Sequence, residues 1–419
     1  MNKLSDIAKE EPQAALSAYN MGLSRRWTFL QRTVKDIGHL FKPLEEAIRN
    51  ELIPAIIGRA VSDLERQMIA LPYRLGGLGI QDPTVTADIE FKTSIHLTRQ
   101  LTELIFAQDM DVSKLDKKAM KETKQKLKMG KENDMKKTAE EISEQLTDTG
   151  RRSMLAAQEK GASSWLSALP IKSLGYALNK QEFRDAVSLR YGWKVKDTPN
   201  FCACNKPNSV DHALTCKKGG YVSMRHNALR DTEAIIMKEV CKDVQVEPFL
   251  LPTSEELLQN RTTVAERARL DISARGIHNR NEKTFFDIRV THPNCDSNKD
   301  KSLAQIYKEQ EAEKKGKYND RILQVEKASF IPLVFTTTGG LGKECDKLNK
   351  KLADLIAAKR GESYADVIKH IRTRLRFSLL RSTLVTLRGF HGKTDIKQGE
   401  KNLEQISFNL IPEARCYET

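Results

Sequence analysis

The sequence predicts two parts: a mostly α-helical N-terminal half, and a C-terminal α/β domain in which helices flank a short mixed sheet. Residues 1–105 repeat apolar side chains at helix-like intervals and contain few strand signals. Residues 284–291 have the aromatic and β-branched composition of a buried strand. An amphipathic pattern over 302–327 leads into the apolar stretch "SFIPLVFTTTGGLG", which predicts a long helix between two strands.

The N-terminal half divides into three predicted segments. The helical region 1–105 includes the glycine- and proline-rich turn "LPYRLGGLGIQDP" near its end. Residues 106–160 are rich in lysine and glutamate, which predicts a solvated helical linker, with a nucleic-acid-binding tail as the alternative. Residues 161–200 regain apolar content, and we expect a small helical core there built from Trp165, Leu169, Phe183 and Trp193.

The charge of the chain indicates a polyanionic partner. Its 419 residues carry a formal net charge of +14, and nucleic acid is the commonest partner of such proteins. A basic protein without such a partner is the alternative. No apolar run reaches the length of a membrane span, and the N-terminus lacks the apolar core of a signal peptide, so we expect an intracellular protein with no membrane partner.

A cluster of possible metal ligands lies in "FCACNKPNSVDHALTC", at Cys202, Cys204, His212 and Cys216. The last two are four residues apart and would share one helix face, which suits tetrahedral zinc. Only one residue separates the first two, whereas zinc sites usually have two to four, so His226 or Cys241 could replace one of them. Free buried cysteines are the remaining interpretation. We expect a structural Zn²⁺ site over 201–222, followed by Lys217 and Lys218 as phosphate contacts.

The C-terminal part, 223–392, alternates helix and strand patterns and precedes a tail, 393–419. We expect helices over 225–241, 302–327, 344–359 and 363–388, and strands over 269–274, over 284–291 and in "SFIPLVFTTTGGLG". "GGLGK" at 339–343 is too short for a phosphate-binding loop, so it predicts a turn. We therefore expect no small-molecule cofactor.

Two aspartates occupy equivalent places in the first two strands. Asp271 lies in "RARLDISARG" and Asp287 in the apolar strand "KTFFDIRVTHP". A lone buried carboxylate is costly, so neighbouring strands that carry both could share one divalent cation. Ties to backbone amides, or to Arg269 and Arg289, are the structural alternative. We expect Mg²⁺ or Mn²⁺, which can activate water for phosphodiester hydrolysis.

A cation is needed beside these carboxylates, and two are available. Arg289 is two residues after Asp287 and so lies on the same strand face, but arginine stays protonated and is a poor proton acceptor. Lys314 falls on the apolar stripe of the helix 302–327, whereas Lys315 and Lys317 point progressively away. A lysine that faces the sheet requires an anion, which favours Lys314.

The order of helix, two aspartate strands, lysine helix and apolar strand resembles the PD-(D/E)XK nuclease core. More specifically, 201–345 resembles the zinc knuckle and restriction-like endonuclease at the C-terminal end of non-LTR retrotransposon polyproteins. The matching pieces are the Cys-Cys-His-Cys cluster, "RHN" (Arg225, His226, Asn227), "RLD", "DIR" and "KKGKY". Leu270 stands where the family usually has proline, and Arg289 where the wider superfamily has lysine.

This resemblance implies a metal-dependent DNA endonuclease with Asp271 and Asp287 as metal ligands and Lys314 as the base-like residue. It also implies nucleic-acid contact by the "RHN" residues, retroelement RNA as a second partner, and a nuclear location. "SAYNMGLSRRWTFLQRTV" and "LPYRLGGLGI" resemble the helical region after a reverse-transcriptase palm, and the palm itself is missing from this sequence. A catalytically decayed nucleic-acid-binding remnant is the main alternative, and a scaffolding protein is another.

Arginines recur every seven residues in the last predicted helix, at Arg374, Arg381 and Arg388. Such spacing places them along one side of the helix. Two interpretations stay open: a solvated face, or a row of side chains that follows the phosphates of bound DNA.

Overall fold

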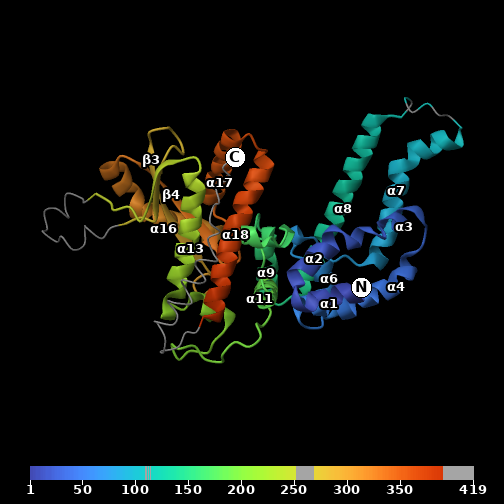
Figure 1. Ribbon diagram of the computed structural model, residues 1–419, viewed down its shortest axis with the longest axis horizontal. Helices are drawn as coiled ribbons and strands as arrows, with labels where there is room; N and C mark the ends of the chain where they lie inside the picture. The colour runs from blue at the N-terminus through green and yellow to red at the C-terminus, as the bar shows by residue number, and fades with distance from the viewer. Residues whose placement is uncertain (109–110, 112, 114, 252–268, 390–419) are drawn as a thin grey trace. The chain divides into compact units, whose positions relative to one another are not determined.

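The computed structural model describes residues 1–419 except 109–110, 112, 114, 252–268 and 390–419 (Figure 1). The expected tail, 393–419, lies outside the described residues. The chain forms two compact units. The first unit comprises Met1–Gln158 and Ala177–Val187, and the second comprises Glu159–Tyr176 and Ser188–Thr419.

The described residues of the first unit form helices and turns without a strand, which confirms the helical prediction for the N-terminal half. Local signals set some helix ends: Ser62 and Glu65 form a capping box at one, and Asp82 accepts a backbone hydrogen bond at another. The α-helices are α1 (Asn2–Glu10), α2 (Pro12–Met21), α3 (Thr28–Thr33), α4 (Lys42–Ala47), α5 (Ile53–Ile57), α6 (Asp63–Ala70), α7 (Pro83–Phe106), α8 (Lys117–Gln145) and α9 (Asp148–Gln158).

Within the segment 106–160, the described residues from Lys117 onward are mostly helical, as expected, but part of the segment is packed. Its main helices are α8 and α9. Lys131 of α8 pairs with Glu90 of α7 at 2.8 Å, and Ala139 and Ile142 in the second half of α8 are buried. Other apolar residues of this segment remain at the surface, among them Met129, which is 58% exposed, so the segment is only partly packed.

The apolar residues expected to share a small core over 161–200 do not do so. Trp165, on α10 (Ser164–Ser167), is buried in the second unit. Phe183, on α11 (Lys180–Tyr191), is buried in the first unit, and Leu169 is 52% exposed. Apolar content alone predicts burial but does not say which core receives each side chain.

The second unit has the predicted succession of helices and strands, with one strand added. Its further elements are α12 (Val210–Thr215), α13 (Tyr221–Lys238), β1 (Lys242–Val246), β2 (Ile272–Arg275), β3 (Lys283–Thr291), α16 (Leu303–Arg321), β4 (Ser329–Thr336), α17 (Lys343–Arg360) and α18 (Tyr364–Arg388). A π-helical turn, Ile322–Glu326, extends α16 to the predicted helix end. The added strand, β1, is mostly exposed, and its apolar alternation is limited to Val244 and Val246, which is too short to predict a strand from the sequence.

The four strands of the described residues form one mixed sheet in the order β1-β2-β3-β4. β1 and β2 are antiparallel, as are β2 and β3, whereas β3 and β4 are parallel. Ile272 pairs with Phe286, so Asp271, one residue before β2, lies beside Asp287. Pro332 lies in β4, which is an edge strand, where the absence of a backbone N–H is tolerated.

Successive side chains of β3 point to opposite faces of the sheet. Phe286 and Ile288 belong to a large core with apolar residues of α13, α17 and α18. Phe285 belongs to a smaller core that includes Ile322 at the end of α16. By alternation Asp287 shares the face of Phe285, so it lies on the side of the sheet that α16 covers. None of the described helices combines the length and apolar content that a membrane crossing requires.

Candidate functional site

Asp287 is a buried carboxylate in the middle of β3. Its relative exposure is 6%, and its neighbours Phe286 and Ile288 are fully buried on the opposite face. The strand is therefore packed on both sides, as its composition predicts. A carboxylate in this position requires a cation or a set of hydrogen-bond donors.

Lys314 of α16 supplies that cation. Its Nζ lies 2.5 Å from Asp287 Oδ2, and the two side chains are 14% and 8% exposed. Lys315 instead pairs with Glu344 at 3.1 Å, and Lys317 is exposed. The expectation that Lys314, rather than its neighbours, faces the sheet is confirmed.

Asp271 is held by two donors at the start of β2. Its Oδ2 accepts a hydrogen bond from the backbone N–H of Ile288 at 2.5 Å and lies 3.1 Å from Nε2 of His226. The same Nε2 is 3.1 Å from the carbonyl oxygen of Ile288. A backbone amide therefore does hold this aspartate, as the structural alternative expected, while Arg269 pairs with Glu247 instead.

His226 is the residue whose role the sequence did not reveal. It was expected to contact nucleic acid or to complete the zinc site, and it instead reaches from α13 to Asp271 and the backbone of β3. Its distance of 45 residues from Asp271 in the chain leaves no local spacing signal. The "RHN" resemblance points to the position but not to this contact.

The charges of this site influence one another. Burial raises the pKa of Asp287, the charge of Lys314 lowers it, and the charge of Asp271 raises it again, with a net rise above its usual range. Burial lowers the pKa of His226, but the hydrogen bond and charge of Asp271 outweigh this effect and raise it. The two aspartates are thus close enough to repel, and the contacts with Lys314 and His226 offset this repulsion.

The oxygen atoms of this site suit a hard divalent cation. The carboxylates of Asp271 and Asp287 and the carbonyl of Ile288 are the ligand types that Mg²⁺ and Mn²⁺ prefer. The approach of a histidine N–H and a lysine ammonium to these oxygens indicates a negative local potential. The oxygens present are therefore of the types that such an ion binds.

Arg289, the other expected catalytic residue, has an exposed side chain on β3. It lies on the same strand face as Asp287, but the ion pair of Asp287 is made by Lys314. The structure therefore brings Asp271, Asp287, Lys314 and His226 together and leaves Arg289 at the solvent boundary.

The second candidate site is the cysteine and histidine cluster. A short turn brings Cys202 and Cys204 to one place: the N–H of Cys202 donates to the carbonyl of Lys206, and Phe201 pairs with Pro207. Asn205 in this turn has a φ of 65°, a conformation that asparagine tolerates better than most residues. A single intervening residue is thus no obstacle to a shared site.

Helix α12 supplies the other two ligands. The hydroxyl of Ser209 accepts the N–H of His212 and caps the helix start, and Cys216 follows its last turn. All four ligand atoms, from Cys202, Cys204, His212 and Cys216, lie within 4.8 Å of one another. The cluster could therefore hold a metal ion such as zinc without His226 or Cys241.

The spacing of the ligand atoms matches tetrahedral coordination. Two sulfur atoms bound to one zinc at about 2.3 Å lie about 3.8 Å apart, and Cys202 Sγ and Cys216 Sγ are 3.7 Å apart. Cys204 Sγ and His212 Nε2 are 3.2 Å apart. Burial raises the pKa of Cys202 to about 11, so its thiolate form would require a cation beside it.

A buried histidine joins this cluster to the sheet. His292, which follows β3, has a side chain that is 4% exposed. Its Nε2 is 2.7 Å from Oδ1 of Asp211 on α12, and its Nδ1 is 2.7 Å from Oγ1 of Thr337, which follows β4. Asp211 directly precedes the ligand His212, so the cluster is tied to the ends of two strands.

The expected phosphate contacts after the cluster divide into exposed and buried residues. Lys217, Lys218 and Asn227 are exposed. Arg225 is 2% exposed and donates to the carbonyl of Leu214 on α12 at 3.1 Å. Helix packing therefore directs the Arg225 guanidinium inward, away from the surface where the expected nucleic-acid contact would be made.

The three arginines of α18 are not a uniformly solvated face. Arg374 has a side chain that is 19% exposed and lies 4.0 Å from Glu239. Arg381 is half-buried, and Arg388 donates to the backbone carbonyl of Asp197 at 3.1 Å. Most residues of α18 are buried. The seven-residue spacing of these arginines therefore belongs to a helix packed in the core and does not mark a solvated face.

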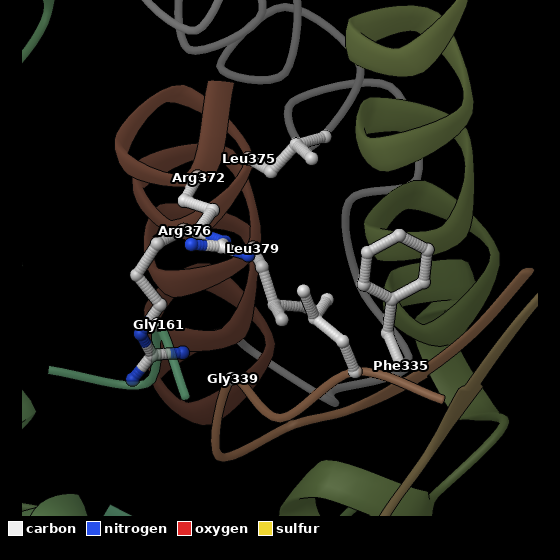
Figure 2. A pocket seen from close by; sticks show the side chains of 8 residues that line it. Gly161, Phe335, Gly339, Arg372, Leu375, Arg376 and Leu379 are labelled. Atoms are coloured by element: carbon white, nitrogen blue, oxygen red, sulfur yellow. The ribbon is translucent and has the colours of Figure 1, made fainter. Parts of the chain in front are cut away.

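A small cavity lies between α18 and the turn after β4, away from both candidate sites (Figure 2). Arg372 and Arg376 contribute to its wall, together with apolar side chains such as Phe335 and Leu379. Gly339 has a φ of 100° and packs so tightly that a Cβ there would lie 2.4 Å from the Arg376 guanidinium. "GGLGK" thus forms a turn, as predicted, and not a phosphate loop.

Comparison with known proteins assigns no family to this chain. No family model matches the chain, and no curated protein matches it.

Proposed function

We propose that the second unit is a metal-dependent DNA endonuclease that hydrolyses phosphodiester bonds. The observation that carries this proposal is the convergence of Asp271, Asp287 and Lys314 from β2, β3 and α16. Carboxylate pairs with an adjacent ammonium suit phosphodiester hydrolysis, because they combine metal binding with charge stabilisation. The resemblance of the strand and helix motifs to restriction-like endonucleases of retrotransposons supports DNA as the substrate.

Each residue has a distinct role in this proposal. Asp271, Asp287 and the Ile288 carbonyl would hold Mg²⁺ or Mn²⁺, which when bound polarises a phosphoryl oxygen and makes water more acidic. Lys314 would donate to a phosphate oxygen and offset the charge that develops there. His226 keeps Asp271 oriented through its hydrogen bond and is thus a positioning residue.

The metal of the cysteine and histidine cluster would be Zn²⁺ with a structural role. Four protein ligands leave no open coordination position, which is typical of structural zinc. The tie from Asp211 through His292 to the sheet would let this ion stabilise the strand ends beside the proposed active site.

A nucleic-acid-binding protein without catalysis is the second candidate function. It is favoured by the contacts of the carboxylates with other side chains of the protein, since Lys314 pairs with Asp287 and His226 contacts Asp271. In this case the basic excess of the chain would still bind DNA, and the carboxylates would contribute only to stability.

Plasmid nicking separates the two. Supercoiled plasmid is incubated with the full chain in Mg²⁺, in Mn²⁺ and in EDTA. The endonuclease proposal expects metal-dependent nicking, its loss in Asp287→Asn, and at least a tenfold decrease in Lys314→Met. Lys315→Met is the matched control. Lys315 is exposed and pairs with Glu344, away from Asp287, so its replacement should leave nicking unchanged.

DNA binding is measured in parallel with all three variants. Binding that persists in Asp287→Asn while nicking disappears supports the endonuclease. A parent protein that binds DNA but does not nick it under any metal condition would establish the second candidate function instead.

A further inference from the structure

The first half of α8 carries an unusual density of positive charge. Residues 117–131 contain seven lysines and one glutamate. Four of these lysines follow the spacing i, i+4, i+7, i+11, which aligns side chains along one face of a helix. We call them the lysine row, and they are Lys117, Lys121, Lys124 and Lys128, all exposed.

The row lies on the solvent side of α8. The half-buried positions of this part of the helix are Ala119, Met120, Thr123 and Leu127, which fall on another face. Figure 1 shows α8 beside α7 in the first unit, and the Lys131–Glu90 ion pair connects the two helices. The second half of α8 is anchored by buried Ala139 and Ile142. A supported helix therefore presents the row over a length of about 16 Å.

The positive charge of the row is not neutralised by ion pairs among the residues that the structure describes. None of its four lysines forms an ion pair with any residue that the structure describes, in contrast to Lys131. On α7, Glu103 is already paired with Arg99 at 2.9 Å. Like charges four residues apart destabilise a helix. An arrangement that repels itself is relieved when a polyanion binds along it.

We propose that the lysine row docks on the phosphate backbone of double-stranded DNA. A duplex carries one negative charge for about 1.7 Å of its axis, so a straight row of four lysines can reach several phosphates at once. Sites for single strands usually add aromatic side chains on which bases stack. Residues 117–131 contain no aromatic side chain, which favours a duplex.

The row would position DNA without reading its sequence, because lysine contacts to phosphate carry no base information. The choice of DNA rather than duplex RNA rests on the proposed endonuclease function. The docking surface itself rests on α8 alone, and it includes no residue of the proposed active site.

The test compares two double variants of the same helix. Lys121→Gln/Lys124→Gln removes two charges from the row. Lys118→Gln/Lys126→Gln removes two charges from other faces of the same helix, and glutamine keeps the helix propensity in both. Binding of a labelled 20-base-pair duplex to the full chain is followed by fluorescence anisotropy in EDTA at several salt concentrations.

We expect the row variant to lose at least tenfold in affinity at 100 mM salt, and its slope of log K against log salt to decrease by about two. The off-row variant should lose less than threefold. Equal losses in the two variants would overturn the proposal, since only the total charge would then matter. The same assay with a labelled 20-base single strand checks the duplex assignment, and a loss confined to the single strand would overturn it.

A negative result for the lysine row can be told apart from a negative result for the proposed endonuclease. Binding in EDTA does not require the metal site, so a protein that never nicks can still show the difference between the variants. Conversely, a row variant that binds the duplex as tightly as the parent would overturn this docking surface and leave the endonuclease assignment unchanged.

Discussion

Lys314 Nζ and Asp287 Oδ2 form a buried ion pair, 2.5 Å apart, between α16 and the centre of β3. Burial makes the pair costly to break, because a single remaining charge has neither water nor a partner. The same pair places the Lys314 ammonium beside Asp287, the carboxylate that would bind the proposed metal ion. Stability and the proposed chemistry therefore depend on the same two side chains.

We expect Lys314→Met to destabilise the second unit, because Asp287 is left buried without its partner. Losing one member of a buried pair costs about 3–5 kcal/mol. Chemical denaturation with urea measures the change, and Lys315→Met should stay within about 0.5 kcal/mol of the parent, as is usual for surface substitutions.

The double variant Asp287→Asn/Lys314→Met tests the pairing directly. A double-mutant cycle should give a coupling free energy of about 1–3 kcal/mol in favour of the pair. Strictly additive changes would show that the two side chains do not interact in solution.

We expect one zinc ion for each chain, held by Cys202, Cys204, His212 and Cys216. After dialysis against metal-free buffer, elemental analysis should give nearly equal amounts of zinc and protein. His212→Ala combined with Cys216→Ala should lose the zinc, because two of four ligands are removed. Cys241→Ala is the control and should retain it. Zinc that persists in the double variant would place the metal elsewhere.

His292→Phe should destabilise the second unit by about 1–3 kcal/mol, because Asp211 and Thr337 each lose a buried hydrogen-bond partner. It should also release zinc faster to a chelator, since Asp211 is adjacent to the ligand His212 on α12. The release is followed with a colorimetric zinc dye. Thr337→Val is the companion variant, which removes one of the two hydrogen bonds and should have an intermediate effect.

Glu233 should make the second unit less stable as the pH rises. This side chain of α13 is fully buried, and neither carboxylate oxygen has a hydrogen-bond partner among the described residues. Burial raises its pKa from 4.5 to about 8. Between these values the folded protein keeps a proton that the unfolded chain releases, so the free energy of unfolding decreases by roughly 1.4 kcal/mol per pH unit.

Glu233→Gln tests this dependence because glutamine is neutral at every pH. Urea unfolding at pH 5, 6, 7 and 8 should show the variant gaining stability relative to the parent as the pH increases. Glu362→Gln, at an exposed position, is the control and should follow the parent. A constant difference across this range would show that Glu233 does not titrate between these values.

Local sequence pattern was sufficient to predict much of the second unit. Helical period placed Lys314 on the buried side of its helix and Lys315 on the other, and the composition of β3 predicted a strand packed on both faces. The clustering of four metal ligands within fifteen positions needed no tertiary information, since a turn and one short helix bring them together. These features depend on residues that are near one another in the chain.

Only the tertiary structure decided the rest, because it depends on contacts between distant residues. The packing of α13 brings His226 to Asp271 and directs Arg225 inward, although the two are adjacent in the sequence. β1 is a strand because β2 supplies its hydrogen bonds, whereas its own apolar pattern is limited to Val244 and Val246. Trp165 and Phe183 have the same apolar character, yet they enter different cores, because burial free energy rewards removal from water and is indifferent to which core provides it.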